Sequence, residues 1–198
     1  MINVKIIRHS ERLDATNLFC WLFFSFGYHW VDTPLSDNGH KMAQEKGKLF
    51  SQQDFNPKHI YSSPYVRTIA TASIIKTFFP QSELIIDASI SEHQPYFRHR
   101  TGVYPNGIPT TDYPFPESIT QLSSRTRSAI NNLLEKHDSD LLICTHGALV
   151  KAYADHINNI YPDLNLDVEH IPYLSTLSFT YDKNTNTIIK DSIQLDNC

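Results

Sequence analysis

Two arginines flank a histidine near the start of the chain, and this grouping suits phosphoryl chemistry. Arg8 and His9 are followed by Ser10, Glu11 and Arg12. Arginine carries a planar, permanently charged guanidinium whose N–H groups match phosphate oxygens. A neutral imidazole can attack phosphorus and carry the transferred group covalently. The segment is therefore a candidate phosphate site with His9 as the nucleophile, and the alternative is a basic surface turn after an edge strand.

Two further basic residues follow predicted strands later in the chain. Arg67 falls in the first turn of a predicted helix after the strand 59–62, and His146 lies between the apolar run 140–144 and another predicted helix. The start of a helix favours an anion, because its free N–H groups and its dipole point outwards there. We therefore expect both residues to join the basic residues of the first segment.

The elements that must position these residues alternate between strand and helix. The alternation predicts a three-layer α/β/α sandwich with a largely parallel central sheet. Parallel sheets place ligand sites at the carboxyl ends of their strands, so the candidate residues should converge. The predicted strands are 2–7, 59–62, 84–86 and 140–144, and the predicted helices are 36–53, 63–79, 118–137 and 148–160.

Cap residues mark where several of these helices should begin. Ser36 and Ser63 are predicted N-caps, and Pro64 suits the first helical position. The stretch 118–121 reads as a capping box. Near the end of the chain, polar and apolar residues alternate on both sides of 182–186, which predicts a C-terminal β-hairpin.

Composition limits the function classes that fit this chain. Its 198 residues are 40% hydrophobic and 19% charged, which is typical of a globular protein, and we expect a single domain over residues 1–198. The formal net charge of -4 argues against a nucleic-acid partner, because such binding neutralises many phosphates with a basic surface. Any anion site should therefore be a local cluster.

Cysteine usage and hydropathy favour a cytoplasmic protein. The three cysteines are Cys20, Cys144 and Cys198, an odd number without metal-type spacing, which fits a reducing compartment. The apolar run 18–26 is too short to span a membrane as a helix and lacks a signal-peptide cleavage pattern. We expect no membrane partner and a core position for Cys144.

Motifs along most of the chain resemble those of the histidine phosphatase (phosphoglycerate mutase-like) superfamily. The resemblance implies a transient phosphate on His9, and proton transfer by Glu92, first to the leaving oxygen and then from water. The residues that would hold the phosphoryl oxygens are Arg8, Arg12, Arg67 and His146, with Ser10 beside them. The motifs that carry the resemblance are Arg8–Arg12, Ser62–Pro64 with Arg67 and Thr71–Ala72, Glu92, and Thr145–Gly147.

Three elements look most like one branch of that superfamily. They are Arg8–Asp14, Asp32–Ser36 and Ile171–Tyr173. The branch holds the suppressor-of-T-cell-receptor-signalling (Sts) phosphatase domains and the insect ecdysteroid-phosphate phosphatases. The resemblance implies a histidine acid phosphatase-type phosphomonoesterase, with protein tyrosine phosphatase-like activity as one form of it. Its partner would be a phosphoprotein or a phosphorylated small-molecule substrate. Aromatic residues within 18–30 favour aromatic or bulky apolar esters.

Three features of the sequence leave their roles open. Ser10 replaces the glycine that the family commonly has after the nucleophile, and it either donates a hydrogen bond or fills space. Residues 18–31 form either a buried core helix or a substrate-facing lid. Arg98–Arg100 either contacts a second anionic group or lies in a solvated loop, and the loop is favoured because charge clusters usually face water.

Competing functions have weaker support in the sequence. A phosphoglycerate mutase would retain the phosphoryl group, and a catalytically silent module would bind a phosphorylated ligand without turnover. The chain lacks a Gly-rich phosphate loop, a Gly-x-Ser-x-Gly elbow and a His-Glu-x-x-His zinc motif. The proposed chemistry needs no metal or other cofactor, because arginines supply the positive charge. The oligomeric state is not predicted.

Overall fold

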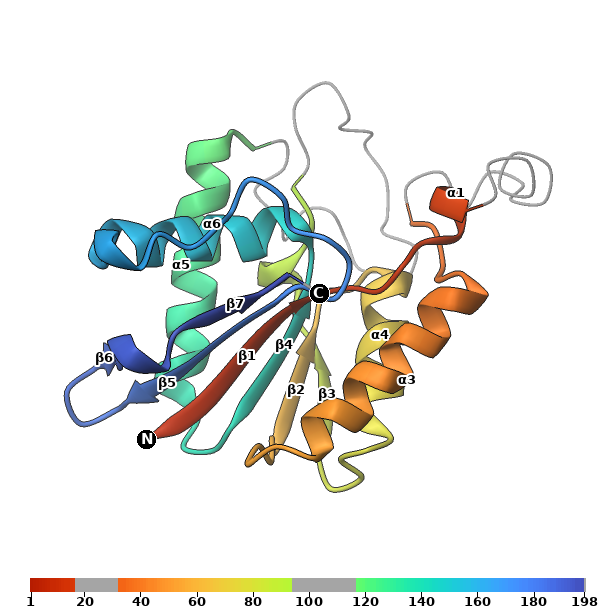
Figure 1. Ribbon diagram of the computed structural model, residues 1–198, viewed down its shortest axis with the longest axis horizontal. Coiled ribbons are helices and arrows are strands. Elements are labelled where there is room, and N and C mark those ends of the chain that lie inside the picture. The colour runs from red at the N-terminus through yellow and green to blue at the C-terminus, as the bar shows by residue number, and fades with distance from the viewer. Residues whose placement is uncertain (17–31, 94–116, 198) are drawn as a thin grey trace.

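Short strands form one mixed sheet at the centre of the protein (Figure 1). The computed structural model describes residues 1–16, 32–93 and 117–197. Within them the strand order is β3-β2-β4-β1-β5-β6, and β7 also pairs with β5. The first four strands run parallel, and β5 runs antiparallel to its neighbours. The strands are β1 (Ile2–Arg8), β2 (His59–Ser62), β3 (Glu83–Ile86), β4 (Leu141–Thr145), β5 (Thr176–Asp182), β6 (Thr187–Ile188) and β7 (Gln194–Asp196).

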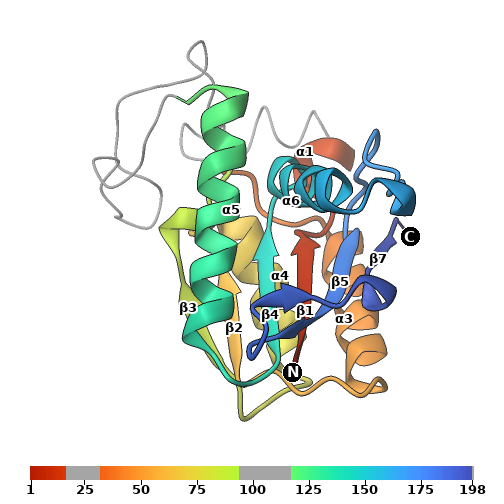
Figure 2. The same ribbon diagram turned by 90° about the vertical axis from the view of Figure 1, so that its left-hand side faces the viewer.

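Helices cover both faces of the sheet, which confirms the predicted three-layer α/β fold. α3 (Asp37–Ser51) and α4 (Val66–Lys76) lie on one face, and α5 (Ile119–Lys136) and α6 (Gly147–Ile160) lie on the other (Figures 1 and 2). None of the helices in the described ranges is long and apolar enough to cross a membrane. The shorter helices are α1 (Leu13–Thr16), η1 (Ala88–Ile90), η3 (Pro162–Leu164) and η4 (Lys190–Ser192).

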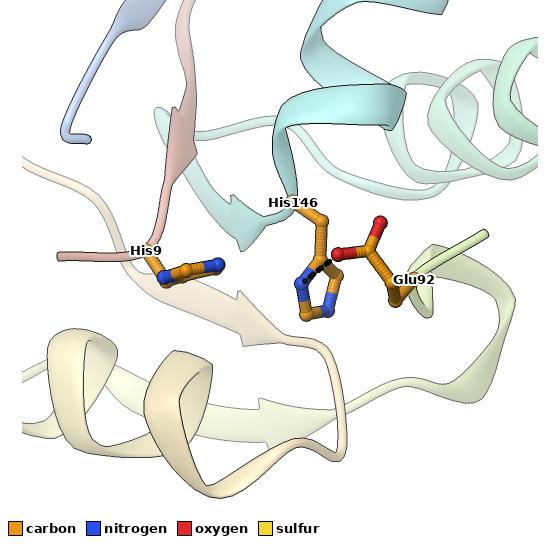
Figure 3. A group of neighbouring side chains, drawn as sticks. All are labelled: His9, Glu92 and His146. Carbon is orange, nitrogen blue, oxygen red and sulfur yellow. Dashed lines mark ion pairs between the residues drawn. The ribbon is translucent and has the colours of Figure 1, made fainter. Parts of the chain in front are cut away.

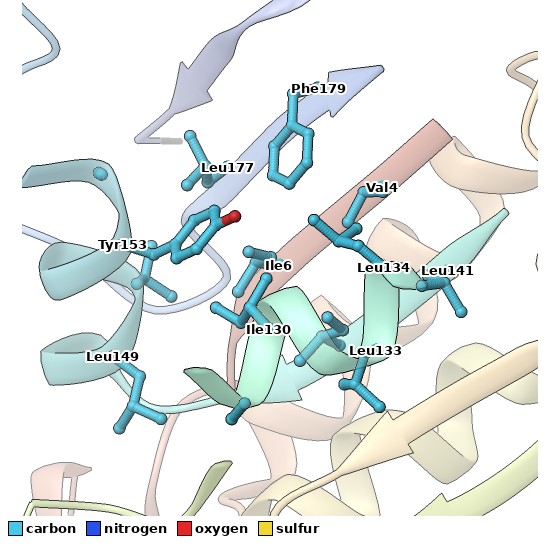
Figure 4. Packing of buried hydrophobic residues seen from close by; sticks show 14 of the residues in the cluster. Val4, Ile6, Ile130, Leu133, Leu134, Leu141, Leu149, Tyr153, Leu177 and Phe179 are labelled. Atoms are coloured by element: carbon cyan, nitrogen blue, oxygen red, sulfur yellow. The ribbon is translucent and has the colours of Figure 1, made fainter. Parts of the chain in front are cut away.

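Two apolar cores hold the layers together. Successive side chains of a strand point to opposite faces, so Ile6 packs under α5 and α6 while Ile7 packs under α3 and α4. Figure 4 shows the first core, where Ile130 and Tyr153 approach the sheet from the two helices. Cys144 is fully buried in the second core, as predicted for a core strand.

The pairing register of the parallel strands aligns the ends that carry the candidate residues. Arg8 is paired with Thr145 across β1 and β4, and Ser62 is paired with Cys144 across β2 and β4. The ladder continues beyond the last strand residues, because His9 N–H donates to the Thr145 carbonyl at 2.9 Å. The residues that follow β1, β2 and β4 therefore leave the sheet side by side.

Two of the three predicted helix caps are confirmed, and one is wrong. The Ser36 hydroxyl accepts from the Gly39 N–H, and Ser118 forms the predicted capping box. Ser63 does not cap a helix: α4 begins at Val66, and its N-cap residue makes no side-chain cap hydrogen bond. The carboxylate of Asp32, far away in sequence, accepts the Val66 N–H at 2.9 Å instead.

The predicted C-terminal hairpin is present, and its return arm is divided. The turn between β5 and β6 contains Asn186 at φ 57°, a left-handed conformation that asparagine tolerates. After β6 the turn η4 interrupts the ladder, and β7 pairs with the other end of β5. The returning chain therefore contacts β5 as two short strands.

Candidate active site

His9 lies just beyond the end of β1, and its hydrogen bonds define which ring nitrogen carries a proton. The side chain is buried, and Nδ1 is 2.8 Å from the Ser10 carbonyl oxygen. A carbonyl can only accept, so Nδ1 carries the proton. Nε2 is 3.2 Å from Arg67 Nε, which can only donate, so Nε2 presents its lone pair. The ring is therefore a neutral imidazole.

Burial and neighbouring charge keep His9 in that neutral form. Removal of water lowers the pKa of His9 well below its ordinary value, and Arg67 and His146 lower it further. The imidazole therefore stays unprotonated at neutral pH. An unprotonated ring nitrogen is the state that can act as a nucleophile.

Arg67 is held by contacts on several sides. It occupies the first turn of α4, as predicted, and is 2% exposed. Its Nη1 lies 3.3 Å from a carboxylate oxygen of the buried Asp32. The guanidinium carbon lies 4.4 Å from the centre of the Tyr65 ring, within the range of a cation–π contact. These contacts fix the guanidinium beside His9.

His146 lies opposite His9, at the N-cap of α6. The two ring centres are 5.3 Å apart. Its Nε2 is 2.8 Å from the Ser63 hydroxyl, and its Nδ1 is 3.3 Å from both Glu92 Oε2 and Arg67 Nη2. Burial lowers the pKa of His146 to about 4, although Glu92 acts in the opposite direction. Burial therefore favours the neutral form of the His146 ring.

Glu92 completes the group, as Figure 3 shows. It lies two residues beyond η1, and its side chain is 26% exposed, so the carboxylate reaches both the cluster and solvent. Oε2 is 3.5 Å from Arg67 Nη2. Burial acts to raise the pKa of Glu92, but His146 and Arg67 outweigh it and lower the pKa overall. The carboxylate is ionised in this arrangement.

Arg8 approaches the cluster from the side of the loop after η3. Its guanidinium donates to the Ile171 carbonyl and lies 4.3 Å from the centre of the Tyr173 ring. The same tyrosine ring is 5.8 Å from the His9 ring. Arg8 Nε is buried and has no hydrogen-bond partner among the described residues. One N–H of the Arg8 guanidinium is thus left without a partner in the described part of the chain.

Two other predicted phosphate contacts are engaged elsewhere. The Arg12 guanidinium forms an ion pair with Asp14. The Ser10 hydroxyl donates to the Gly39 carbonyl at 2.7 Å, and the Ser10 N–H donates to the Thr71 hydroxyl at 3.0 Å. Phosphate binding by Ser10 stays a prediction, and the hydroxyl hydrogen-bonds to the backbone of α3 in this structure. The segments 18–31 and 98–100, whose roles were left open, lie outside the described residues.

A family comparison agrees with this arrangement. The model of the histidine phosphatase superfamily (branch 1) matches residues 25–192. The chain belongs to this superfamily. A relative from Acanthamoeba polyphaga mimivirus, named an uncharacterized phosphoglycerate mutase family protein, is 49% identical over 99% of this chain and 98% of its own. The phosphoglycerate mutase-like protein 4 of Arabidopsis thaliana is 24% identical over 62% of this chain and 59% of its own.

Two solved phosphatase structures share the fold of this chain at low sequence identity. The ecdysone phosphate phosphatase of Bombix mori, solved with tungstate, has a TM-score of 0.68 at 17% identity and covers 98% of this chain and 94% of its own. The phosphoserine phosphatase of Entamoeba histolytica, solved with 3-phosphoglyceric acid, has a TM-score of 0.61 at 16% identity and covers 100% of this chain and 98% of its own.

The candidate site offers an anion a better environment than a cation. His9, Glu92 and His146 present atoms within 4.8 Å of one another, a spacing that would suit a metal ion. However, the Arg67 guanidinium directs N–H groups at those same atoms, and its positive charge would repel a metal ion. The same donors suit the oxygens of a phosphoryl group.

Sequence reasoning missed three residues of this site. Asp32 pairs with Arg67, Ser63 contacts His146, and Tyr173 lies against Arg8 and His9. Asp32 and Tyr173 belong to segments noted for their resemblance to one branch. Ser63 belongs to the motif Ser62–Pro64, which resembles the superfamily, but it was assigned to a helix cap. No local pattern indicates these partners, because each contact joins residues distant in the sequence.

Proposed function

We propose that this protein hydrolyses phosphomonoesters through a phosphohistidine intermediate on His9. The observation that carries the proposal is the pair of hydrogen bonds made by the two ring nitrogens of His9. Its Nδ1 proton is held by the Ser10 carbonyl, and its Nε2 lone pair faces the Arg67 guanidinium at 3.2 Å. A phosphoryl group held by that guanidinium would lie next to the lone pair.

In the first step, His9 Nε2 attacks phosphorus as the ester P–O bond breaks. Negative charge spreads over the three phosphoryl oxygens, and the cationic groups of Arg67 and Arg8 stabilise it. His146 and the start of α6 supply further N–H donors at the same place. Arg12 would contribute after exchanging Asp14 for a phosphoryl oxygen.

Glu92 handles the proton in both steps. A bound phosphoryl group would offset the positive charge that now lowers the pKa of Glu92, and the carboxyl would then take up a proton. It gives that proton to the leaving oxygen. In the second step the resulting carboxylate takes a proton from water as the water oxygen attacks phosphorus, and the P–N bond to His9 breaks. The products are an alcohol and inorganic phosphate.

Tyr173, next to the candidate nucleophile, indicates the class of substrate. Tyr173 places an aromatic ring beside both His9 and Arg8, and such a ring favours an aromatic or bulky apolar ester. The proposal extends to a closer relation with the Sts and ecdysteroid-phosphate phosphatase branch. The segment Ile171–Tyr173, which resembles that branch, supports it because Arg8 contacts both ends.

A phosphoglycerate mutase is the second candidate, favoured by the name of the mimivirus relative. A mutase would return the phosphoryl group to the substrate rather than to water. Assay of 3-phosphoglycerate with its bisphosphate primer separates the two functions. Efficient interconversion without phosphate release would reverse our ranking, and tight phosphate-ligand binding without turnover would favour a silent binding module.

The central test is the His9→Ala variant with nitrophenyl phosphate as substrate. We expect turnover to fall by more than about a thousandfold, because the nucleophile is lost. When the reaction with a phosphate-radiolabelled ester is quenched, labelled phosphate should remain on the wild-type chain and not on the variant. The label should be labile in acid and stable in alkali. His40→Ala, which alters an exposed histidine on α3, is the matched control. Turnover retained by His9→Ala would exclude the mechanism.

A further inference from the structure

A buried ion pair lies directly behind the segment that carries Glu92. Arg125 on α5 binds Glu117 through two hydrogen bonds, from Nε at 3.0 Å and from Nη2 at 2.5 Å. The Glu117 side chain has no exposed surface, and that of Arg125 is 9% exposed. Such two-point pairing fixes the plane of the guanidinium. Nη1 of Arg125 is thereby directed away from Glu117.

That remaining nitrogen holds the backbone just before Glu92. Arg125 Nη1 donates to the Ser89 carbonyl at 2.7 Å and to the Ser91 carbonyl at 3.1 Å. Ser89 lies within η1, and Ser91 is the C-cap residue of η1. Glu92 directly follows Ser91 in the chain. These two hydrogen bonds from Arg125, called the clamp below, therefore fix the position of the Glu92 backbone.

A second contact ties the same turn to the strand end that carries His146. The Thr145 hydroxyl donates to the Ile90 carbonyl at 2.7 Å. Ile90 is completely buried. The backbone before Glu92 is thus joined to β4 on one side and to α5 on the other. The distance between Glu92 and His146 then depends on two buried donors and not on packing alone.

We propose that Arg125 is a positioning residue for proton transfer by Glu92. The inference rests on the proposed phosphatase function and names a residue that does not touch the substrate. Held by Glu117, Arg125 keeps the Glu92 carboxyl within reach of the leaving oxygen. Loss of the clamp lets Glu92 move while His9, Arg67 and Arg8 stay in place.

Dependence on the leaving group tests this role. Departure of an acidic nitrophenol needs little protonation, whereas departure of an alkyl alcohol depends on the proton donor. The quantity to compare is kcat/KM, which covers steps up to cleavage of the ester. For Arg125→Lys, which can reach only part of the clamp, we expect kcat/KM to fall about tenfold more for an alkyl phosphate than for nitrophenyl phosphate.

Two further variants keep the test decisive. Glu117→Gln removes the charge that orients Arg125, and it should shift the same ratio of kcat/KM values in the same direction, by less. Arg127→Lys, on the exposed side of α5, should leave the ratio unchanged. Thermal unfolding identifies which variants fold, and a folded variant of either clamp residue suffices.

The outcomes distinguish failure of the positioning role of Arg125 from failure of the proposed phosphatase function. Equal losses for both esters in folded clamp variants, or no loss, would overturn the positioning role while leaving the phosphatase intact. A wild-type protein without phosphatase activity would overturn the function and this inference together. A selective loss for the alkyl ester, absent from Arg127→Lys, supports the inference.

Discussion

The Ser63 hydroxyl lies 2.8 Å from Nε2 of His146. A residue just after β2 therefore contacts the imidazole of the N-cap residue of α6. Both side chains are completely buried. The contact joins two strand ends across the sheet and leaves the other ring nitrogen directed at Glu92. The orientation of the His146 ring therefore depends on the hydroxyl of Ser63, which is not one of the basic candidate residues.

Replacement of Ser63 should weaken both folding and turnover. In Ser63→Ala, His146 Nε2 loses its partner, and a buried unpaired nitrogen costs about 1–3 kcal/mol. We expect a lower free energy of unfolding and a kcat reduced by about tenfold, since His146 gains freedom to rotate. Urea unfolding and steady-state kinetics measure the two effects. Ser123→Ala, at an exposed site on α5, is the control; equal behaviour of the two variants would contradict the prediction.

Acid should destabilise the fold through its buried histidines. Burial lowers the pKa of His146 to about 4 and lowers that of His9 well below its ordinary 6.5, whereas in the unfolded chain both rings take up protons near that ordinary value. The unfolded state thus binds more protons as pH falls from about 6.5 towards 4, so stability is lost over that window.

The expected size can be set for His146 alone. Its contribution is about 3 kcal/mol by the acid end of the window, because each tenfold change in proton affinity is worth about 1.4 kcal/mol. The contribution of Glu92, whose pKa is lowered from 4.5, is lost only below that ordinary value. Urea unfolding at about pH 7 and about pH 5 should show the loss, and His146→Asn should reduce it. Equal stability at both pH values would refute the assignment.

Gly39 should be intolerant of any side chain. A Cβ at this position would lie 2.3 Å from the Glu11 carbonyl oxygen, so the backbone after His9 would have to move. We expect Gly39→Ala to lower stability by about 2 kcal/mol and to reduce kcat. Gly47→Ala, also on α3, meets mainly the movable Phe78 side chain. It should affect kcat much less, and a reversed order would disprove the argument.

Local sequence patterns predicted the elements better than their contacts. Ser36 and the capping box at Ser118 act within one helical turn, so a reader of the sequence can identify them. Ser63 followed by Pro64 has the same local pattern, yet its hydroxyl contacts His146, 83 positions away. The wrong cap therefore reflects a tertiary contact that no short window contains.

The candidate site shows the same division. The candidate residues converge because they lie at the ends of strands, at the starts of helices or after the short helix η1, all at the same edge of the sheet. They are Arg8, His9, Arg67, Glu92 and His146. Arg12 obeys the same rule of spacing, but the acidic residue two positions later forms an ion pair with it. Position along a strand predicts which end of the sheet a residue reaches, whereas its final partner depends on competing side chains.

Arg8 pairs with Thr145, and Ser62 pairs with Cys144, so the register of β1, β4 and β2 determines the relative positions of the candidate residues that follow these strands. Deletion of a single residue within β4 would turn its remaining side chains to the opposite face and shift His146 along the strand. Engineering for heat tolerance is therefore best directed to the outer surfaces of α3 and α5, where substitutions leave the pairing register of these strands unchanged.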